Sequence, residues 1–197
     1  YLRFLSEILD RSEDNLFLRD FLMFQGKIAR YGVFNSLSQT LLKIASPGVP
    51  DFYQGTEVWD LNLVDPDNRR EVPYDDRLRG YLEELERKAA ANVLDLIEEL
   101  LAAPQDGKVK LFLVHRALKA RLEHPDVFRY GSYLPLKVAG PLNDRIVAFA
   151  RQHPRGWALA VVPRFLASVI PDTEVPLGES VWNGTHLVMP SDCPQAW

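Results

Sequence analysis

The chain has 197 residues, of which 47% are hydrophobic and 25% charged, a composition typical of a globular protein with a real core. Its net charge of -4 argues against a nucleic-acid partner, because neutralising phosphates requires a basic face. No apolar run approaches the roughly 20 residues that span a bilayer, so no membrane contact is expected. The single cysteine, Cys193, excludes an internal disulfide and is typical of a cytoplasmic protein.

The first residues, YLRFLSEILD, already follow a helical pattern and lack an initiator Met, so we expect a piece of a longer chain. Apolar residues at helical spacing then form one stripe: Phe17, Phe21, Phe24 and Ile28. Ser36 and Gln39 have the spacing of a capping box, which predicts that a helix begins at residue 36. Residues 46–48, Ser-Pro-Gly, end that helix, and the short aromatic segment 50–54 is predicted to be a buried strand.

Residues 60–75 combine turn formers and charges without apolar periodicity, which predicts a long loop of the kind that often carries function. Apolar residues at helical spacing resume within 78–85, 93–101 and 111–122. From about residue 127 the pattern changes to short strand-like runs separated by Gly, Pro, Asn and Asp. In DRIVAFAR, Val147 and Phe149 are predicted to face one side of a strand and Ile146, Ala148 and Ala150 the other. Asn183-Gly184 is the pair expected in a two-residue hairpin turn. The second part is therefore predicted to be an antiparallel sheet.

A mixture of carboxylates, amides, guanidinium groups and flat aromatic rings follows the predicted strand. Sugars require that mixture, because their hydroxyls pair with polar groups and their C–H faces pack on rings. The candidate substrate-binding residues are Tyr53, Gln54, Glu57, Trp59, Asp65, Asp67, Asn68, Arg69 and Arg70. Two structural alternatives stay open: residues 65–70 could form a self-satisfied turn with solvated arginines, and Glu57 could pair with an arginine inside the protein.

Two long motifs carry a family resemblance. PGVPDFYQGTEVWD and LVDPDNRREVPYDDR, at 47–60 and 63–77, closely resemble the C-terminal catalytic region of maltooligosyltrehalose synthases in the alpha-amylase superfamily. NSLSQTLLKIASPGVPD, HPDVFRYGSYLPL and DRIVAFAR are also similar to that subfamily, so the resemblance covers roughly residues 15–165. PGVPDFYQGTE alone is typical of the whole superfamily, and the joined WDLNLVDPDNRR element narrows the resemblance to the trehalose-forming branch.

The resemblance implies an α+β fold in which residues 1–126 supply the last helices and the eighth strand, 50–54, of a (β/α)8 barrel. Residues 127–197 would form the antiparallel β-sandwich that follows such barrels. The loop after residue 55 would then lie at the C-terminal face, where these barrels hold their active sites. The remainder of the barrel and a maltooligosaccharide are the partners that the resemblance implies, with no cofactor and no metal.

The implied reaction converts the reducing-end α-1,4 bond of a maltooligosaccharide into an α,α-1,1 bond by retaining intramolecular transglycosylation. The family's three catalytic carboxylates follow strands four, five and seven, and no segment here matches them, so no catalytic residue is assigned. We therefore expect this chain to be inactive alone. Two alternatives remain: a fragment of an amylase-type α-glucan hydrolase, or a non-catalytic carbohydrate-binding or stability module with Trp157 and Trp182 on one sheet face.

Overall fold

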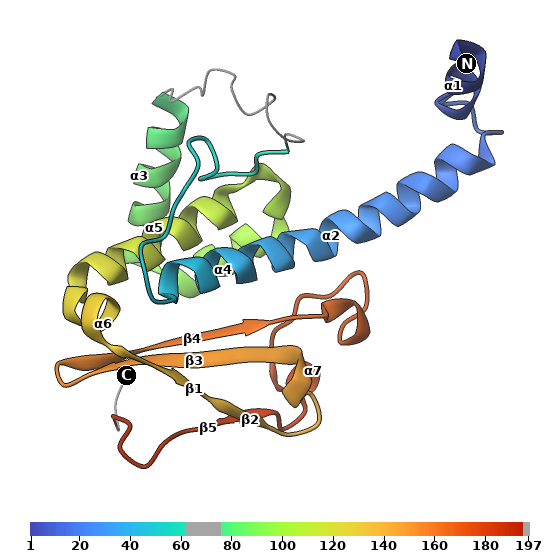
Figure 1. Cartoon of the computed structure of the whole chain (residues 1–197). Coiled ribbons are helices and arrows are strands. Elements are labelled where there is room, and N and C mark those ends of the chain that lie inside the picture. The colour runs from blue at the N-terminus through green and yellow to red at the C-terminus, as the bar shows by residue number, and fades with distance from the viewer. Residues whose placement is uncertain (62–75, 195–197) are drawn as a thin grey trace.

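Helices occupy the first part of the chain and strands the last part, in a computed structural model that describes residues 1–61 and 76–194. The helical elements are α1 (Leu2–Ile8), α2 (Leu16–Ala45), α3 (Asp76–Ala91), α4 (Val93–Ala102), η2 (Pro104–Asp106), α5 (Lys108–Glu123), α6 (Pro125–Tyr130), η3 (Asn143–Arg145), η4 (Leu166–Ser168) and α7 (Glu179–Trp182). The strands are β1 (Ser132–Pro135), β2 (Lys137–Ala139), β3 (Ile146–His153), β4 (Gly156–Pro163) and β5 (His186–Val188). Helices α1 to α6 lie on one side of the strands, and α7 lies beside the end of the strands (Figure 1).

The longest element is α2, a single helix of 30 residues. The Asn15 side chain caps its start by accepting a hydrogen bond from the Leu18 amide at 3.1 Å. Ser46 ends it in an extended conformation, which the following Pro47 imposes on its neighbour. The capping box predicted at Ser36 is wrong, because Asn15 supplies the cap and the helix continues through that position.

The predicted strand at 50–54 is also not formed. Residues 49–53 carry no regular secondary structure, and a turn begins at residue 54. A strand requires a neighbouring strand to accept and donate its backbone hydrogen bonds. The five strands of the described chain pair with one another in two sheets and leave this segment outside both.

The central sheet has the order β1-β3-β4, and both of its pairings are antiparallel. Successive side chains of β3 point to opposite faces of the sheet. Phe149, fully buried, packs with Ala45 of α2 and Phe128 of α6 on the helical side. Ala150 packs with Leu136 on the other side, so the predicted alternation within β3 is confirmed. The sheet therefore has a core on both faces.

The second sheet is the antiparallel pair β2-β5, which contributes to the apolar cluster of the outer face. The hairpin predicted at Asn183-Gly184 is wrong: both residues have positive φ, but Asn183 ends the short helix α7. β5 then pairs with the distant β2. This pairing depends on Gly140, where a Cβ would lie 2.6 Å from the Thr185 Cα.

Buried side chains join the helical and β parts. Ser38 of α2 donates to the Pro163 carbonyl at the end of β4 at 3.0 Å. The Tyr31 hydroxyl lies 2.9 Å from the Ile170 carbonyl and 2.8 Å from the Asp172 carboxylate, so its one proton is shared between these two acceptors. These contacts join residues before position 126 to residues after it. The division into two domains at residue 126 stays a prediction.

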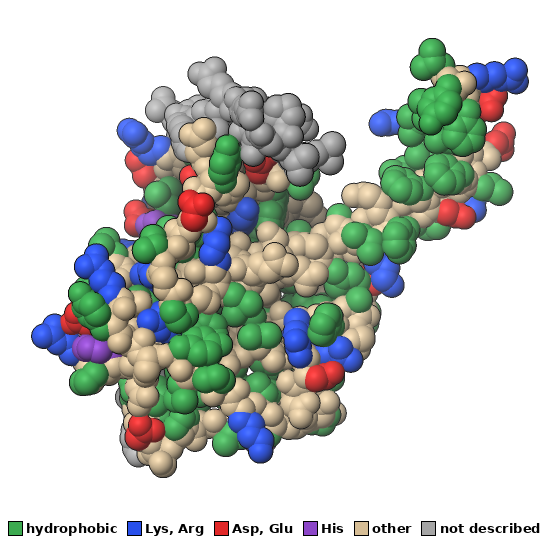
Figure 2. Space-filling view, in the orientation of Figure 1, with side chains coloured by type: hydrophobic (Ala, Val, Ile, Leu, Met, Phe, Trp, Pro, Cys, Tyr) green, Lys and Arg blue, Asp and Glu red, His purple; other side chains and the backbone are tan. Residues whose placement is uncertain are grey.

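The N-terminal arm, α1 and the first half of α2, projects from the rest of the molecule (Figure 1). The predicted stripe is present, but its four residues are 51–61% exposed, and the space-filling view shows apolar side chains along the arm (Figure 2). The exposed apolar residues of the arm are Tyr1, Leu2, Phe4, Leu5, Leu9, Leu16, Phe17, Phe21, Leu22, Met23, Phe24 and Ile28. In the described ranges, no helix is long and apolar enough to cross a membrane.

Candidate functional site

Two arginines fix the end of α2, where the candidate segment begins. Arg121 of α5 donates to the Ile44 carbonyl at 2.7 Å and also to the Gly48 carbonyl. Arg151 of β3 donates to the Ala45 carbonyl at 3.4 Å. The last carbonyls of a helix lack intrahelical partners and carry partial negative charge, so cations are favourable there. The chain therefore leaves α2 from a fixed position.

Arg151 is 2% exposed, and its second donor contact is the Gly131 carbonyl at 2.8 Å. Burial, and then the charge of Arg121, lowers the pKa of the Arg151 guanidinium. A buried guanidinium is stable only when its donors are satisfied. The two carbonyls satisfy the two terminal nitrogens and tie α2 to the strands, while the buried Nε atom has no hydrogen-bond partner among the described residues.

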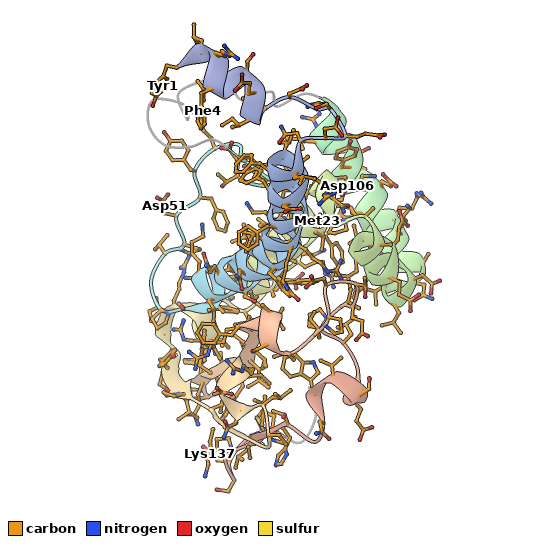
Figure 3. The ribbon with its side chains drawn as sticks, turned by 90° about the vertical axis from the view of Figure 1, so that its right-hand side faces the viewer. Tyr1, Phe4, Met23, Asp51, Asp106 and Lys137 are labelled. Carbon is orange, nitrogen blue, oxygen red and sulfur yellow. The ribbon has the colours of Figure 1, made fainter. Side chains whose placement is uncertain are left out.

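A tight turn places Tyr53 and Gln54 on the surface. The amide and the hydroxyl of Thr56 both donate to the Tyr53 carbonyl, at 3.1 and 2.6 Å. Gly55 has φ of +89°, a conformation that glycine adopts without strain. Tyr53 is 51% exposed. Asp51, two residues earlier, is also exposed and lies at the outer edge of the chain that follows α2 (Figure 3). A phenol and an amide are thus available to a ligand.

Trp59 is anchored to the junction of η2 and α5. Its indole N–H donates to the Pro104 carbonyl at 2.7 Å, and its ring packs partly buried against the cluster of α3, α4 and α5. Gly107 has φ of +80°, and a Cβ there would lie 3.0 Å from the Val58 Cβ and 3.2 Å from the Trp59 amide nitrogen. Only glycine allows this close approach. The structure therefore gives Trp59 a positioning contact.

Two lysines contact the aromatic residues on either side of the turn. Lys43 of α2 places its ammonium 3.8 Å from the Phe52 ring centroid. Lys110 of α5 donates to the Val58 carbonyl at 3.1 Å and lies 5.4 Å from the Trp59 ring centroid. Cation–π contacts of this kind strengthen as the cation is desolvated. α2 and α5 together therefore hold the segment 52–59.

Glu57 lies between these anchors and is half-buried. Its Oε2 atom is shielded from solvent and has no hydrogen-bond partner among the described residues. A buried carboxylate oxygen is costly unless a donor reaches it. Among the described residues, the Glu57 carboxylate therefore keeps one buried oxygen without a donor, and the half-buried side chain is a carboxylate of the kind that binds sugar hydroxyls.

The five remaining predicted site residues lie outside the described residues, so their role stays a prediction; they are Asp65, Asp67, Asn68, Arg69 and Arg70. The structure brings together Tyr53, Gln54, Glu57 and Trp59 on one short segment. Lys43 and Lys110, which support that segment, were not predicted from the sequence. Within the described ranges, no three His, Cys, Asp or Glu side chains gather closely enough to hold a metal ion.

A cavity of about 330 Å³ lies elsewhere, between α2, α4, α5 and β4. Its lining is mainly aliphatic and aromatic, with Ser38 and Arg116 as its polar members. The Ser38 hydroxyl already donates to the Pro163 carbonyl. This cavity is therefore less suited to a sugar than the segment 53–60 is.

The comparisons with known proteins agree with one another. A curated protein of Mycobacterium tuberculosis (strain CDC 1551 / Oshkosh), provisionally named maltooligosyl trehalose synthase, is 39% identical over 117 residues, 59% of this chain. A solved structure of maltooligosyl trehalose synthase is 33% identical, with a TM-score of 0.56 over 76% of this chain. The maltooligosyltrehalose synthase of Arthrobacter ramosus is 29% identical, with a TM-score of 0.62 over 84% of this chain. The resemblance to maltooligosyltrehalose synthases is confirmed.

The mixed helical and β fold of this chain therefore matches part of the maltooligosyltrehalose synthase structures. The chain spans 12% of the length of the curated relatives and 19–20% of the solved chains. The relatives are named as synthases, so the chain is similar to part of an enzyme. No family model matches the chain.

Proposed function

We propose that this chain is part of an enzyme that converts the reducing-end α-1,4 bond of a maltooligosaccharide into an α,α-1,1 bond. The observation that carries the proposal is the 39% identity to a maltooligosyl trehalose synthase over 117 residues. The chemistry of the segment 53–60 supports it independently. The segment combines an exposed phenol, an exposed amide and a half-buried carboxylate, which are groups that bind sugar hydroxyls.

The proposed reaction is a retaining transglycosylation within the active site of one enzyme. A carboxylate outside this chain attacks the anomeric carbon, and an acid protonates the leaving oxygen, which frees a glucose from the reducing end. That glucose then rotates and attacks the glycosyl intermediate through its own anomeric hydroxyl. The glucose must stay bound and water must stay out between the two steps. We assign the segment 53–60, with residues 65–70, to the wall that holds this glucose.

The helical part, residues 1–126, would then belong to a (β/α)8 barrel whose strands lie outside this chain, and residues 127–197 would form a β-domain beside it. The exposed apolar side chains of the N-terminal arm support this proposal. Contiguous apolar surface on this scale marks an interaction site in soluble proteins. The partner that we infer for the arm is the remainder of the same enzyme. A cytoplasmic location is proposed from the single cysteine.

The experiment is product analysis with maltopentaose. The longer protein that contains this segment should remove reducing ends without releasing glucose, because the α,α-1,1 bond blocks both anomeric carbons. The 197-residue chain alone should convert nothing. Release of glucose or shorter maltooligosaccharides as the main products would support an α-glucan hydrolase instead. Trehalosyl product from the 197-residue chain alone would show that the catalytic groups lie within it.

A further inference from the structure

Lys110 differs from Lys88 and Lys108, two nearby lysines of α3 and α5, in what it contacts. Lys88 and Lys108 pair with carboxylates, at 2.6 Å to Glu99 and 3.2 Å to Glu84 respectively. Lys110, one turn into α5, reaches the Val58 carbonyl and the Trp59 ring instead. Its charge is therefore directed at the candidate sugar wall.

The charged groups near Lys110 lie on α2 and on the segment 57–60. Burial, followed by the positive charge of Lys43 on α2, lowers the pKa of the Lys110 ammonium, while Asp60 and Glu57 act in the opposite direction. An ammonium is retained in a half-buried place at a cost in desolvation. An uncharged side chain of the same length would avoid that cost and could still fill the space beside Trp59. The charge itself therefore requires an explanation.

The charge of Lys110 is explained by its two contacts, which fix the positions of Val58 and Trp59. The hydrogen bond to the Val58 carbonyl fixes the peptide that directly follows Glu57, and the ring contact fixes Trp59. The Pro104 carbonyl also accepts a hydrogen bond from the Trp59 indole, and Gly107 packs closely against Val58 and the Trp59 amide. With Val58 and Trp59 held, the half-buried carboxylate of the adjacent Glu57 has a defined position.

We propose that Lys110 is a positioning residue of the sugar wall, which fixes Val58 and Trp59 and thereby sets the place of the Glu57 carboxylate. This proposal rests on the proposed function, because it assumes that the Glu57 acceptor receives a sugar hydroxyl. Lys110 does not touch the sugar in this account. Its effect passes through the segment that it holds, so its loss weakens sugar binding without removing a sugar contact.

The test compares Lys110→Met, Lys110→Arg and the control Lys119→Met, which removes an exposed lysine from the same helix. The first measurement is the indole N–H resonance of Trp59 in the 197-residue chain. The second is the dissociation constant for maltopentaose of the longer protein that contains the segment. Lys110→Met should move the Trp59 resonance and weaken binding about tenfold, because the displaced Glu57 carboxylate loses the charge-assisted hydrogen bond that it accepts from a sugar hydroxyl. Lys110→Arg should restore most of both values, and Lys119→Met should change neither.

Unchanged maltopentaose affinity in Lys110→Met would overturn the proposal, whether or not the Trp59 resonance moves. A longer protein that binds no maltopentaose would overturn it too, together with the proposed function. Hydrolysis products from the unmodified protein would refute the proposed trehalose-forming reaction only. In that case the affinity ratio between Lys110→Met and the unmodified protein still decides whether Lys110 positions the wall.

Discussion

Replacing Gly107 by alanine tests the close contact that positions Trp59. Two costs combine at this residue. Its φ of +80° strains any residue with a Cβ by about 1–2 kcal/mol. The new Cβ would also lie 3.0 Å from the Val58 Cβ and 3.2 Å from the Trp59 nitrogen, and overpacking of this kind costs about 1–3 kcal/mol. A smaller gain of about 0.4–1 kcal/mol arises in the unfolded chain. Gly107→Ala should therefore lower the free energy of unfolding by about 2–4 kcal/mol.

Alanine substitutions at two other glycines separate the cost of backbone strain from the cost of overpacking. Gly48 has φ of +104°, and a Cβ added there would meet no described atom within 4 Å, so Gly48→Ala carries the strain alone and should cost about 1 kcal/mol. Gly26 lies inside α2 with the same free space, so Gly26→Ala should stabilise by about 0.5–1 kcal/mol. Urea denaturation gives all three values, and Trp59 fluorescence should change in Gly107→Ala alone. Equal losses for Gly107→Ala and Gly48→Ala would refute the close contact.

Three further predictions concern the scaffold. Arg151→Ala should lower the free energy of unfolding by about 2–4 kcal/mol in urea denaturation, because it opens a cavity and frees two buried carbonyls; a loss under about 0.5 kcal/mol would contradict this. Phe24→Ala should be nearly neutral in the 197-residue chain but destabilising in the longer protein, and equal effects on the two melting temperatures would argue against the docking of the arm. The hydrogen bond from Tyr31 lowers the pKa of Asp172. The folded pKa lies below the unfolded value near 3.8, so this stabilisation is complete above that pH and is lost as the pH falls through the folded pKa. Asp172→Asn should flatten that acid dependence of the melting temperature, and an unchanged slope would count against the pair.

Local patterns predicted the parts of the fold that depend on local chemistry. Alternation within DRIVAFAR gave β3, and the Ser-Pro-Gly sequence marked the end of α2, because both depend on residues adjacent in the chain. The capping box at Ser36 was wrong because the packing of a long helix outweighs a local cap. The hairpin at Asn183-Gly184 was wrong because positive φ suits a helix end as well as a hairpin.

The residue types of the candidate site could be predicted from the sequence, but the distant residues that hold the site in place could not. The polar and aromatic side chains after residue 52 are contiguous, so the sequence shows them together. Lys110 is 52 residues from Val58, and Arg121 is 77 residues from Ile44. No pattern in one sequence connects such distant residues. One signal was available: Arg151 directly follows the apolar run 146–150, and a charged residue that continues such a strand indicates a buried charge with partners.

The central claim is that the segment 53–60 holds the freed glucose of a trehalose-forming enzyme. The direct measurement is the ratio of α,α-1,1-linked product to free glucose made from maltopentaose by the longer protein carrying Tyr53→Ala. Tyr130→Ala, which removes a 72% exposed tyrosine from α6, is the matched control. Loss of the Tyr53 ring should let glucose escape and lower the ratio about tenfold, while the control keeps the ratio of the unmodified protein. An unchanged ratio in Tyr53→Ala would contradict the account.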